Sequence, residues 1–101
     1  MRKAKVYNFG ILAGILSDEK GKYIFNYDKN YSGPAISLNM PLTEEEYPYD
    51  FFPPFFDGLL PEGNQLEALL RQTKVDRNDL FSQLLTVGKD LVGSITVEAD
   101  E

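Results

Sequence analysis

Residues 51–63 constrain the fold of this chain more than any other stretch of its sequence. The segment reads Phe-Phe-Pro-Pro-Phe-Phe-Asp-Gly-Leu-Leu-Pro-Glu-Gly, so four phenylalanines and two leucines lie among three prolines and two glycines. Proline fixes φ and removes an N–H donor, so neither a long helix nor a strand can run through it. So much apolar surface is costly to leave in water, at about 25 cal/mol per Å². We therefore predict a compact, buried segment, the aromatic elbow, with one helical turn from Phe55 to Leu60.

The aromatic elbow has two interpretations. In the first, it is a hydrophobic plug that joins a strand-rich first half of the chain to a helix-rich second half. In the second, part of it faces outward and forms a docking surface from Phe51 to Leu66, with Glu44, Glu45 and Glu46 at the rim. Both hold if some of the aromatic side chains are buried and others form an apolar anchor for a partner. The candidate partner-binding residues are Phe51, Phe52, Phe55, Leu59, Pro61, Glu62, Asn64 and Gln65.

Length and composition predict one domain over residues 1–101. A hydrophobic fraction of 43% excludes general disorder, and 101 residues suffice for one modest core. The net charge of −6 argues against direct nucleic-acid binding, which needs a basic surface, and suits a basic protein partner. The N-terminus lacks the apolar core of a secretion signal, and no apolar run approaches the roughly 20 residues that cross a bilayer. We expect a cytoplasmic protein.

The sequence offers no residues for catalysis. It contains no histidine and no cysteine, so the commonest general base and the thiolate metal ligands are missing. Its glycines form no phosphate-binding loop motif. Asp57 and Glu62 are a carboxylate pair, but Asp57 is better explained as a turn or cap residue. We predict a protein that is not an enzyme and that has no cofactor and no metal site.

The first half of the chain predicts an antiparallel meander. Apolar and polar residues alternate, and a hairpin turn is expected at residues 18–21. Residues 43–46 read as an acidic first turn of helix that Pro48 limits to a single turn, with its charges on a solvated face. The strands are expected at residues 3–8, 11–16, 22–27 and 35–40, the last with Ile36, Leu38 and Met40 turned inward.

The second half predicts two helices and a last strand. The first helix is expected at 64–73 and the second at 77–87, with Asp76 as its N-cap and Gly88 as its stop. Their buried sides are expected to be Leu66, Leu69 and Leu70 on the first, and Leu80, Phe81, Leu84, Leu85 and Val87 on the second. A strand at 93–98 and a frayed tail to Glu101 follow. The fold class is therefore α+β, a small antiparallel sheet of about five strands with two to three helices packed on one face.

Three segments, in the same order, resemble the N-terminal subdomain of HipA-type toxin kinases. Residues 55–63, Phe-Phe-Asp-Gly-Leu-Leu-Pro-Glu-Gly, are similar to its signature, residues 34–42 to the preceding strand, and residues 79–95 to the following segment. The resemblance covers nearly the whole chain and implies the same α+β architecture. The nucleotide loop, phosphate-binding lysine and catalytic Asp that such kinases use map onto no position here.

The resemblance implies a protein-binding function. A stand-alone chain of this kind is similar to the small antitoxins (HipS) of HipBST-type toxin–antitoxin systems. Such an antitoxin binds a HipT-like Ser/Thr kinase toxin directly and a HipB-like helix-turn-helix DNA-binding protein through the complex. It would block the kinase cleft or hold the kinase lobes in an inactive arrangement.

Two alternatives stay open beside the antitoxin. The chain could be an accessory N-terminal fragment of a full-length HipA-like kinase, with no activity of its own. It could also be a small adaptor or ligand-binding domain unrelated to kinases. The acidic ending at residues 98–101 favours the antitoxin, in which the native gene would end at Glu101.

Overall fold

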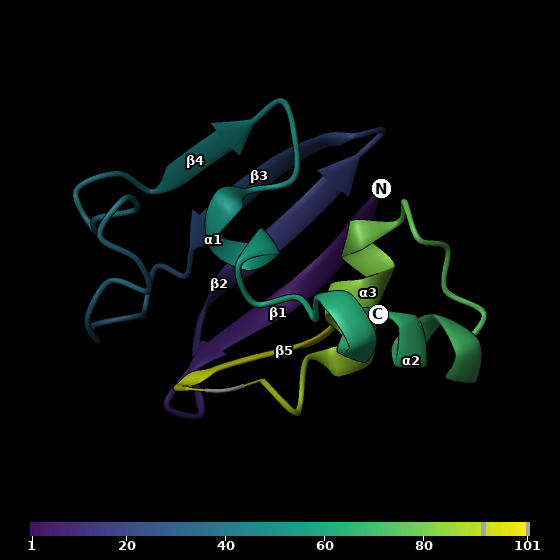
Figure 1. Ribbon diagram of the computed structural model, residues 1–101. Coiled ribbons are helices and arrows are strands. Elements are labelled where there is room, and N and C mark those ends of the chain that lie inside the picture. The colour runs from purple at the N-terminus through teal and green to yellow at the C-terminus, as the bar shows by residue number, and fades with distance from the viewer. Residues whose placement is uncertain (92, 101) are drawn as a thin grey trace.

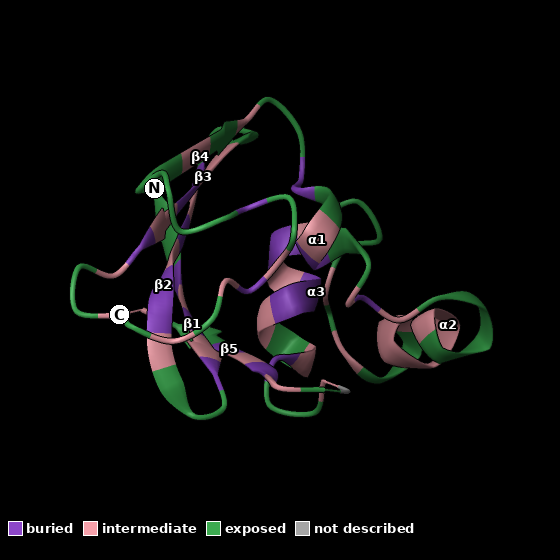
Figure 2. Ribbon diagram, turned by 90° about the vertical axis from the view of Figure 1, so that its left-hand side faces the viewer, coloured by how far each residue is buried: buried purple, intermediate pink, exposed green. Residues whose placement is uncertain are grey.

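The computed structural model describes residues 1–91 and 93–100. Its elements are β1 (Arg2–Asn8), β2 (Ile11–Glu19), β3 (Lys22–Tyr27), β4 (Glu46–Tyr49), α1 (Pro54–Asp57), α2 (Gly63–Gln72), α3 (Leu80–Val87) and β5 (Ile95–Ala99). Five strands form one antiparallel sheet in the order β4-β3-β2-β1-β5, and the helices lie on one side of it (Figures 1 and 2). The predicted α+β fold class is confirmed. Val92, in the third segment of the resemblance, and Glu101 lie outside the described residues.

The first three strands begin where the alternation predicts them, but β2 runs on to Glu19, so the second hairpin turns at Lys20 and Gly21 and not over residues 18–21. Local signals fix both hairpins. Phe9 and Gly10 have φ values of 52° and 79°, and Lys20 and Gly21 have φ values of 56° and 87°. Positive φ at two successive residues is the geometry of a tight turn whose twist matches the strands. The Asp18 carboxylate also accepts a hydrogen bond from the Gly21 N–H, 3.2 Å away, which supports the second turn.

The core lies between the sheet and the helices. The Phe25 ring on β3 meets the Phe56 ring on α1, with centroids 5.9 Å apart, and Phe81 and Leu84 bring α3 onto the same core. Phe81 and Leu84 are therefore buried as predicted, whereas Leu85 is only half-buried, and Phe25 is fully buried on the sheet side of this core. The largest fully buried apolar side chains are Phe25, Phe56, Phe81, Leu16, Met40, Leu84, Val6 and Val97.

The strand predicted at residues 35–40 is wrong, because this segment is an irregular loop. Ile36 and Met40 are buried, but Leu38 is 99% exposed rather than turned inward. The Tyr27 hydroxyl explains the conformation: it donates to the Met40 carbonyl and accepts from the Ile36 N–H, so the loop folds back over the end of β3.

The strand next to β3 is β4. It forms at residues where the sequence predicted an acidic helical turn that is ended by Pro48. Tyr47 pairs with Phe25, and Tyr49 pairs with Tyr23. An edge strand tolerates Pro48 because one row of its N–H groups is not needed for the sheet. Residues 43–46 are exposed, as expected of a solvated run, but Glu46 already belongs to the strand.

The helix α3 begins at Leu80 and not at Arg77. The Asp79 side chain caps it by accepting a hydrogen bond from the Ser82 N–H at 3.2 Å. Asp76, the predicted cap, instead accepts from the Asn78 N–H at 2.8 Å, which makes a local turn. The buried Gln83 amide secures that turn by donating to the Arg77 carbonyl at 2.9 Å.

The chain end, which was predicted to fray, is held in the sheet as far as residue 100. The strand β5 continues to Ala99, and the Asp100 N–H donates to the Lys3 carbonyl at 3.0 Å. Between α3 and β5, Gly88 passes so close to the strand that a Cβ there would overlap the Val97 carbonyl. The Gly88 carbonyl also accepts from the Val97 N–H at 2.9 Å, so the edge of β5 is blocked at its centre.

Arg2 ties the sheet to α3. Its guanidinium is paired with Asp18 and with Asp79 (3.1 Å), and it lies over the Phe81 ring, 4.8 Å from the centroid. Burial disfavours the charged form of Arg2 and by itself would lower its pKa. The two carboxylates outweigh burial, so the pKa of Arg2 is raised. Partial burial by itself would raise the pKa of Asp79. The hydrogen bonds from Ser82 and Arg2 stabilise the carboxylate and outweigh burial, so the pKa of Asp79 is lowered.

Candidate partner-binding surface

The aromatic elbow is divided between the core and the surface. Phe52 is 7% exposed and packs edge-on against Tyr23, with centroids 5.2 Å apart, and Phe56 is fully buried. Phe51 is 63% exposed, and Phe55 and Leu59 are half-buried. The prolines place one turn of helix, α1, between these two sets, close to the turn expected from Phe55 to Leu60. The elbow therefore plugs the core and also presents apolar side chains outside it.

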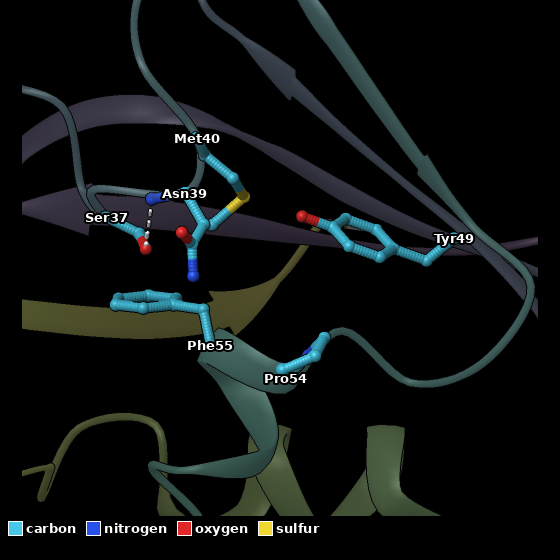
Figure 3. A pocket seen from close by; sticks show the side chains of 6 residues that line it. All are labelled: Ser37, Asn39, Met40, Tyr49, Pro54 and Phe55. Carbon is cyan, nitrogen blue, oxygen red and sulfur yellow. Dashed lines mark hydrogen bonds between the residues drawn. The ribbon is translucent and has the colours of Figure 1, made fainter.

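A first pocket lies where the exposed part of the elbow faces the loop after β3. Its volume is about 400 Å³, and its lining residues are Ser37, Asn39, Met40, Tyr49, Pro54 and Phe55. Figure 3 shows the Asn39 amide and the Tyr49 hydroxyl directed into the space above Phe55. Burial, and to a lesser degree Tyr47, raises the pKa of Tyr49, so its hydroxyl keeps its proton and can donate a hydrogen bond at neutral pH.

A second hollow lies where the elbow meets α2 and the end of α3. Its volume is about 340 Å³, and Leu59, Pro61 and Gln65 line it on the elbow side. Val87 and Leu91 line it on the other side. A smaller hollow of about 220 Å³ adjoins it, where Leu66 of α2 faces Leu80 of α3.

The helix α2 covers the core incompletely. None of its residues is fully buried, and Figure 2 shows it standing away from the sheet and from α3. Its apolar stripe, Leu66, Leu69 and Leu70, is half-buried, so these side chains are less covered than predicted. An amphipathic helix is stabilised mainly by packing of its apolar face. The stripe therefore leaves apolar area that a partner can cover.

The predicted partner-binding residues occupy five different environments. Phe51 is exposed and Phe52 is in the core. Phe55 lines the first pocket, and Leu59, Pro61 and Gln65 line the second hollow. Glu62 precedes α2 and lines the smaller hollow, and Asn64 is exposed in the first turn of the helix. The structure thus brings together Leu59, Pro61 and Gln65 and separates them from Phe51 and Phe55.

Sequence reasoning missed the loop residues Ser37 and Asn39, and Tyr49 of β4, which complete the first pocket. The alternation of Ile36, Leu38 and Met40 indicated a strand, which would have placed these neighbours on an outer face. The prolines at 34 and 41 gave no signal for a loop, because they lie outside the segment and are compatible with a strand between them.

The net negative charge of the chain is concentrated on this part of the molecule. Residues 30–70 contain seven acidic residues and no lysine or arginine, whereas the rest of the chain has ten basic and nine acidic residues. This segment supplies β4, α1 and most of α2, and its acidic residues are Glu44, Glu45, Glu46, Asp50, Asp57, Glu62 and Glu67. Figure 1 shows it running from the sheet edge over the helix side. The surface attracts positive charge.

Among residues 1–91 and 93–100, no group of three or more His, Cys, Asp or Glu side chains could hold a metal ion. In the same described part, no helix has the length and apolar character needed to cross a membrane.

The chain matches the model of the family described as HipA N-terminal domain over residues 4–98. Among solved structures it is similar to the "N-terminal domain of HipA toxin", with a TM-score of 0.82, 28% identity, and coverage of 100% of this chain and 94% of that one. The match is confined to this N-terminal domain and does not include the kinase catalytic part.

Two curated relatives differ greatly in length. An "Uncharacterized protein" of Haemophilus influenzae is 27% identical over 101 residues, which is 100% of this chain and 95% of that protein. A protein of Sinorhizobium fredii named "Putative kinase Y4dM" is 32% identical over 93 residues, which is 82% of this chain and only 23% of that protein. The same domain therefore occurs in a protein scarcely longer than itself and in one several times as long.

Proposed function

The chain belongs to the HipA N-terminal domain family, and we propose that it is a non-catalytic antitoxin that binds and neutralises a HipA-like Ser/Thr kinase toxin. The observation that carries this proposal is the match to the accessory HipA N-terminal domain over residues 4–98, together with the similarity to its solved structure. The Haemophilus influenzae relative supports it, because 95% of that protein is this domain.

The partner is a HipT-like kinase that lacks its own copy of this domain. A domain that packs on a kinase within one polypeptide has a preformed interface, and separating the two parts leaves that interface available for reassociation. The half-buried stripe of α2, the exposed Phe51 and the acidic charge of residues 30–70 are the features expected of such a surface. Binding would neutralise the kinase by blocking its cleft or by holding its lobes in an inactive arrangement.

The antitoxin would act as part of a tripartite toxin–antitoxin system in the bacterial cytoplasm. A HipB-like helix-turn-helix protein would supply DNA binding, and this chain would join it through the complex. Direct contact with DNA is not proposed, because the net charge of −6 and the acidic surface repel phosphates.

A second candidate function is that of an accessory N-terminal subdomain within a longer HipA-like kinase. The similarity to the Sinorhizobium fredii protein favours it, since there the matching domain is 23% of a much longer chain. The discriminating observation is whether the native gene continues beyond codon 101 into kinase sequence.

The binding step is tested by calorimetric titration of this chain into the purified kinase-like protein encoded next to it. We expect saturable binding, typically in the micromolar to nanomolar range for a specific interface. A full-length HipA-like kinase that already carries this domain is the matched control and should not bind. Equal binding to both proteins, or binding to neither, would contradict the proposal.

A further inference from the structure

The first pocket is built to receive a side chain from outside the molecule. Its apolar walls are Met40, Pro54 and Phe55, and Ser37, Asn39 and Tyr49 place polar groups around them (Figure 3). A volume of about 400 Å³ is at the lower end of the range for ligand pockets, roughly 300–1,000 Å³. This combination suits one large apolar side chain whose neighbouring backbone hydrogen-bonds to the polar groups.

The loop on one side of the pocket exposes an apolar side chain to solvent at a fixed position. Leu38 is 99% exposed, between the lining residues Ser37 and Asn39. The loop is fixed around it, because the Met40 N–H donates to the Ser37 carbonyl at 3.1 Å and the Asn39 N–H donates to the Ser37 hydroxyl at 3.2 Å. A single exposed leucine needs no explanation by itself. A preorganised one beside an apolar pocket adds contact area for a ligand at low entropic cost.

The charge around the pocket selects the kind of ligand. The segment that supplies all six lining residues lies within residues 30–70, which contain seven acidic side chains and no basic ones. Asp50 directly follows Tyr49 of the lining and is exposed, whereas Asp57, at the end of α1, lines the smaller hollow instead. An apolar pocket with an acidic border complements a peptide segment that has an apolar residue between basic ones.

We propose that this pocket binds a basic peptide segment of the protein partner and takes one leucine-, methionine- or phenylalanine-sized side chain from it. The identity of the partner as a kinase rests on the proposed function, but the chemistry of the segment does not. The apolar side chain would lie over Phe55, and a flanking lysine or arginine would face the exposed carboxylate of Asp50.

The test uses three synthetic peptides and the full chain labelled with ¹⁵N. One peptide has a central leucine between lysines, the second replaces that leucine by alanine, and the third replaces the lysines by glutamates. We expect the first peptide to shift the amide signals of Ser37, Asn39 and Phe55. Losing the leucine should weaken binding about tenfold or more, since burial of a leucine contributes about 1.5–3 kcal/mol. The glutamate peptide should bind more weakly still.

Three variants locate the binding. Asn39→Trp should fill the pocket and abolish the shifts, and Ser32→Trp, on the same loop but outside the lining, should not. Leu38→Ser, which alters a fully exposed side chain, should weaken binding several-fold without affecting the fold. Equal binding of the leucine and alanine peptides, or unchanged binding by Asn39→Trp, would overturn the inference. A chain that neutralises the kinase but fails this peptide test would refute the inference and leave the proposed function standing.

Discussion

The Tyr27 hydroxyl donates a hydrogen bond to the Met40 carbonyl and thereby holds the loop of the first pocket against the end of β3. The same hydroxyl accepts a hydrogen bond from the Ile36 N–H at 3.1 Å. One side chain therefore satisfies two backbone groups of a loop that has no regular secondary structure. The position of Leu38 and the shape of the pocket both depend on this arrangement.

We expect Tyr27→Phe to destabilise the protein by about 1–3 kcal/mol, because it leaves the buried Ile36 N–H without its acceptor. Urea denaturation followed by circular dichroism measures the loss. Tyr7→Phe is the control, since the Tyr7 hydroxyl bonds the exposed Glu98 on the other side of the sheet. A Tyr27→Phe protein as stable as the wild type would show that the loop does not depend on this hydroxyl.

Gly88→Ala should be among the more damaging small substitutions in the chain. A Cβ at this position would overlap the Val97 carbonyl of β5, and overpacking of this kind typically costs about 1–3 kcal/mol. Gly58→Ala is the matched control, because its Cβ would meet only ordinary contacts, 3.5 Å from the Pro54 carbonyl oxygen. Thermal melts of the two variants give the comparison. Equal melting temperatures would contradict the close approach of α3 to β5.

The stability of the fold should fall in acid partly through Asp79. Its pKa is lowered in the folded state, so its contribution is present above the unfolded value of about 4 and is lost as the pH falls through the folded pKa. Asp79→Asn keeps a capping side chain but removes the charge that pairs with Arg2. We expect this variant to be less stable than the wild type at pH 7 and equally stable near pH 2. A stability difference that is the same at both pH values would argue against this linkage.

The first three strands, the helix α2 and the body of α3 could be predicted from sequence because their signals are local. Period-two alternation and two glycine turns define the hairpins. Phe81 and Leu84, three residues apart and so on one face of a helix, define the buried side of α3. The start of α3 was misplaced because Asp76 and Asp79 are equally good caps by type. Only the tertiary contacts of Asp79 with Arg2 distinguish the two.

The loop at residues 35–40 and the strand β4 could not be predicted, because each depends on a residue distant in sequence. The alternation of Ile36, Leu38 and Met40 is as regular as that of a true strand. The hydrogen bonds of the Tyr27 hydroxyl nevertheless hold this segment outside the sheet. Its place beside β3 is then taken by Tyr47 and Tyr49. The first pocket is formed by these two outcomes together, so its composition was not visible in the sequence.

Leu38 and Phe81 were both predicted to face inward, and their substitution tests directly which of the two side chains is buried. Phe81→Ala should cost about 3–5 kcal/mol, the usual range for a fully buried aromatic side chain. Leu38→Ser should change stability by no more than about 0.5 kcal/mol, as at other exposed positions. Chemical denaturation of both variants measures the contrast. A large loss in Leu38→Ser would mean that residues 35–40 form the inward-facing strand after all.

Phe51 should contribute to partner binding without contributing to the fold. Because its side chain is 63% exposed, Phe51→Ser should fold normally but bind the kinase more weakly, by about tenfold or more if Phe51 is a hot spot. Phe9→Ser is the matched control, since Phe9 is 73% exposed at the turn between β1 and β2. Calorimetry of both variants separates a local contact from a general loss of surface hydrophobicity. Unchanged affinity in Phe51→Ser would remove Phe51 from the interface.

The growth rate of cells that express the neighbouring kinase, with and without this chain, tests the central proposal most directly. We predict that the kinase alone arrests growth and that co-expression of the wild-type chain restores it. Phe81→Ala, which should unfold a large fraction of the protein, should fail to restore it. Continued growth arrest in the presence of the folded wild-type chain would contradict the proposal that this protein is an antitoxin.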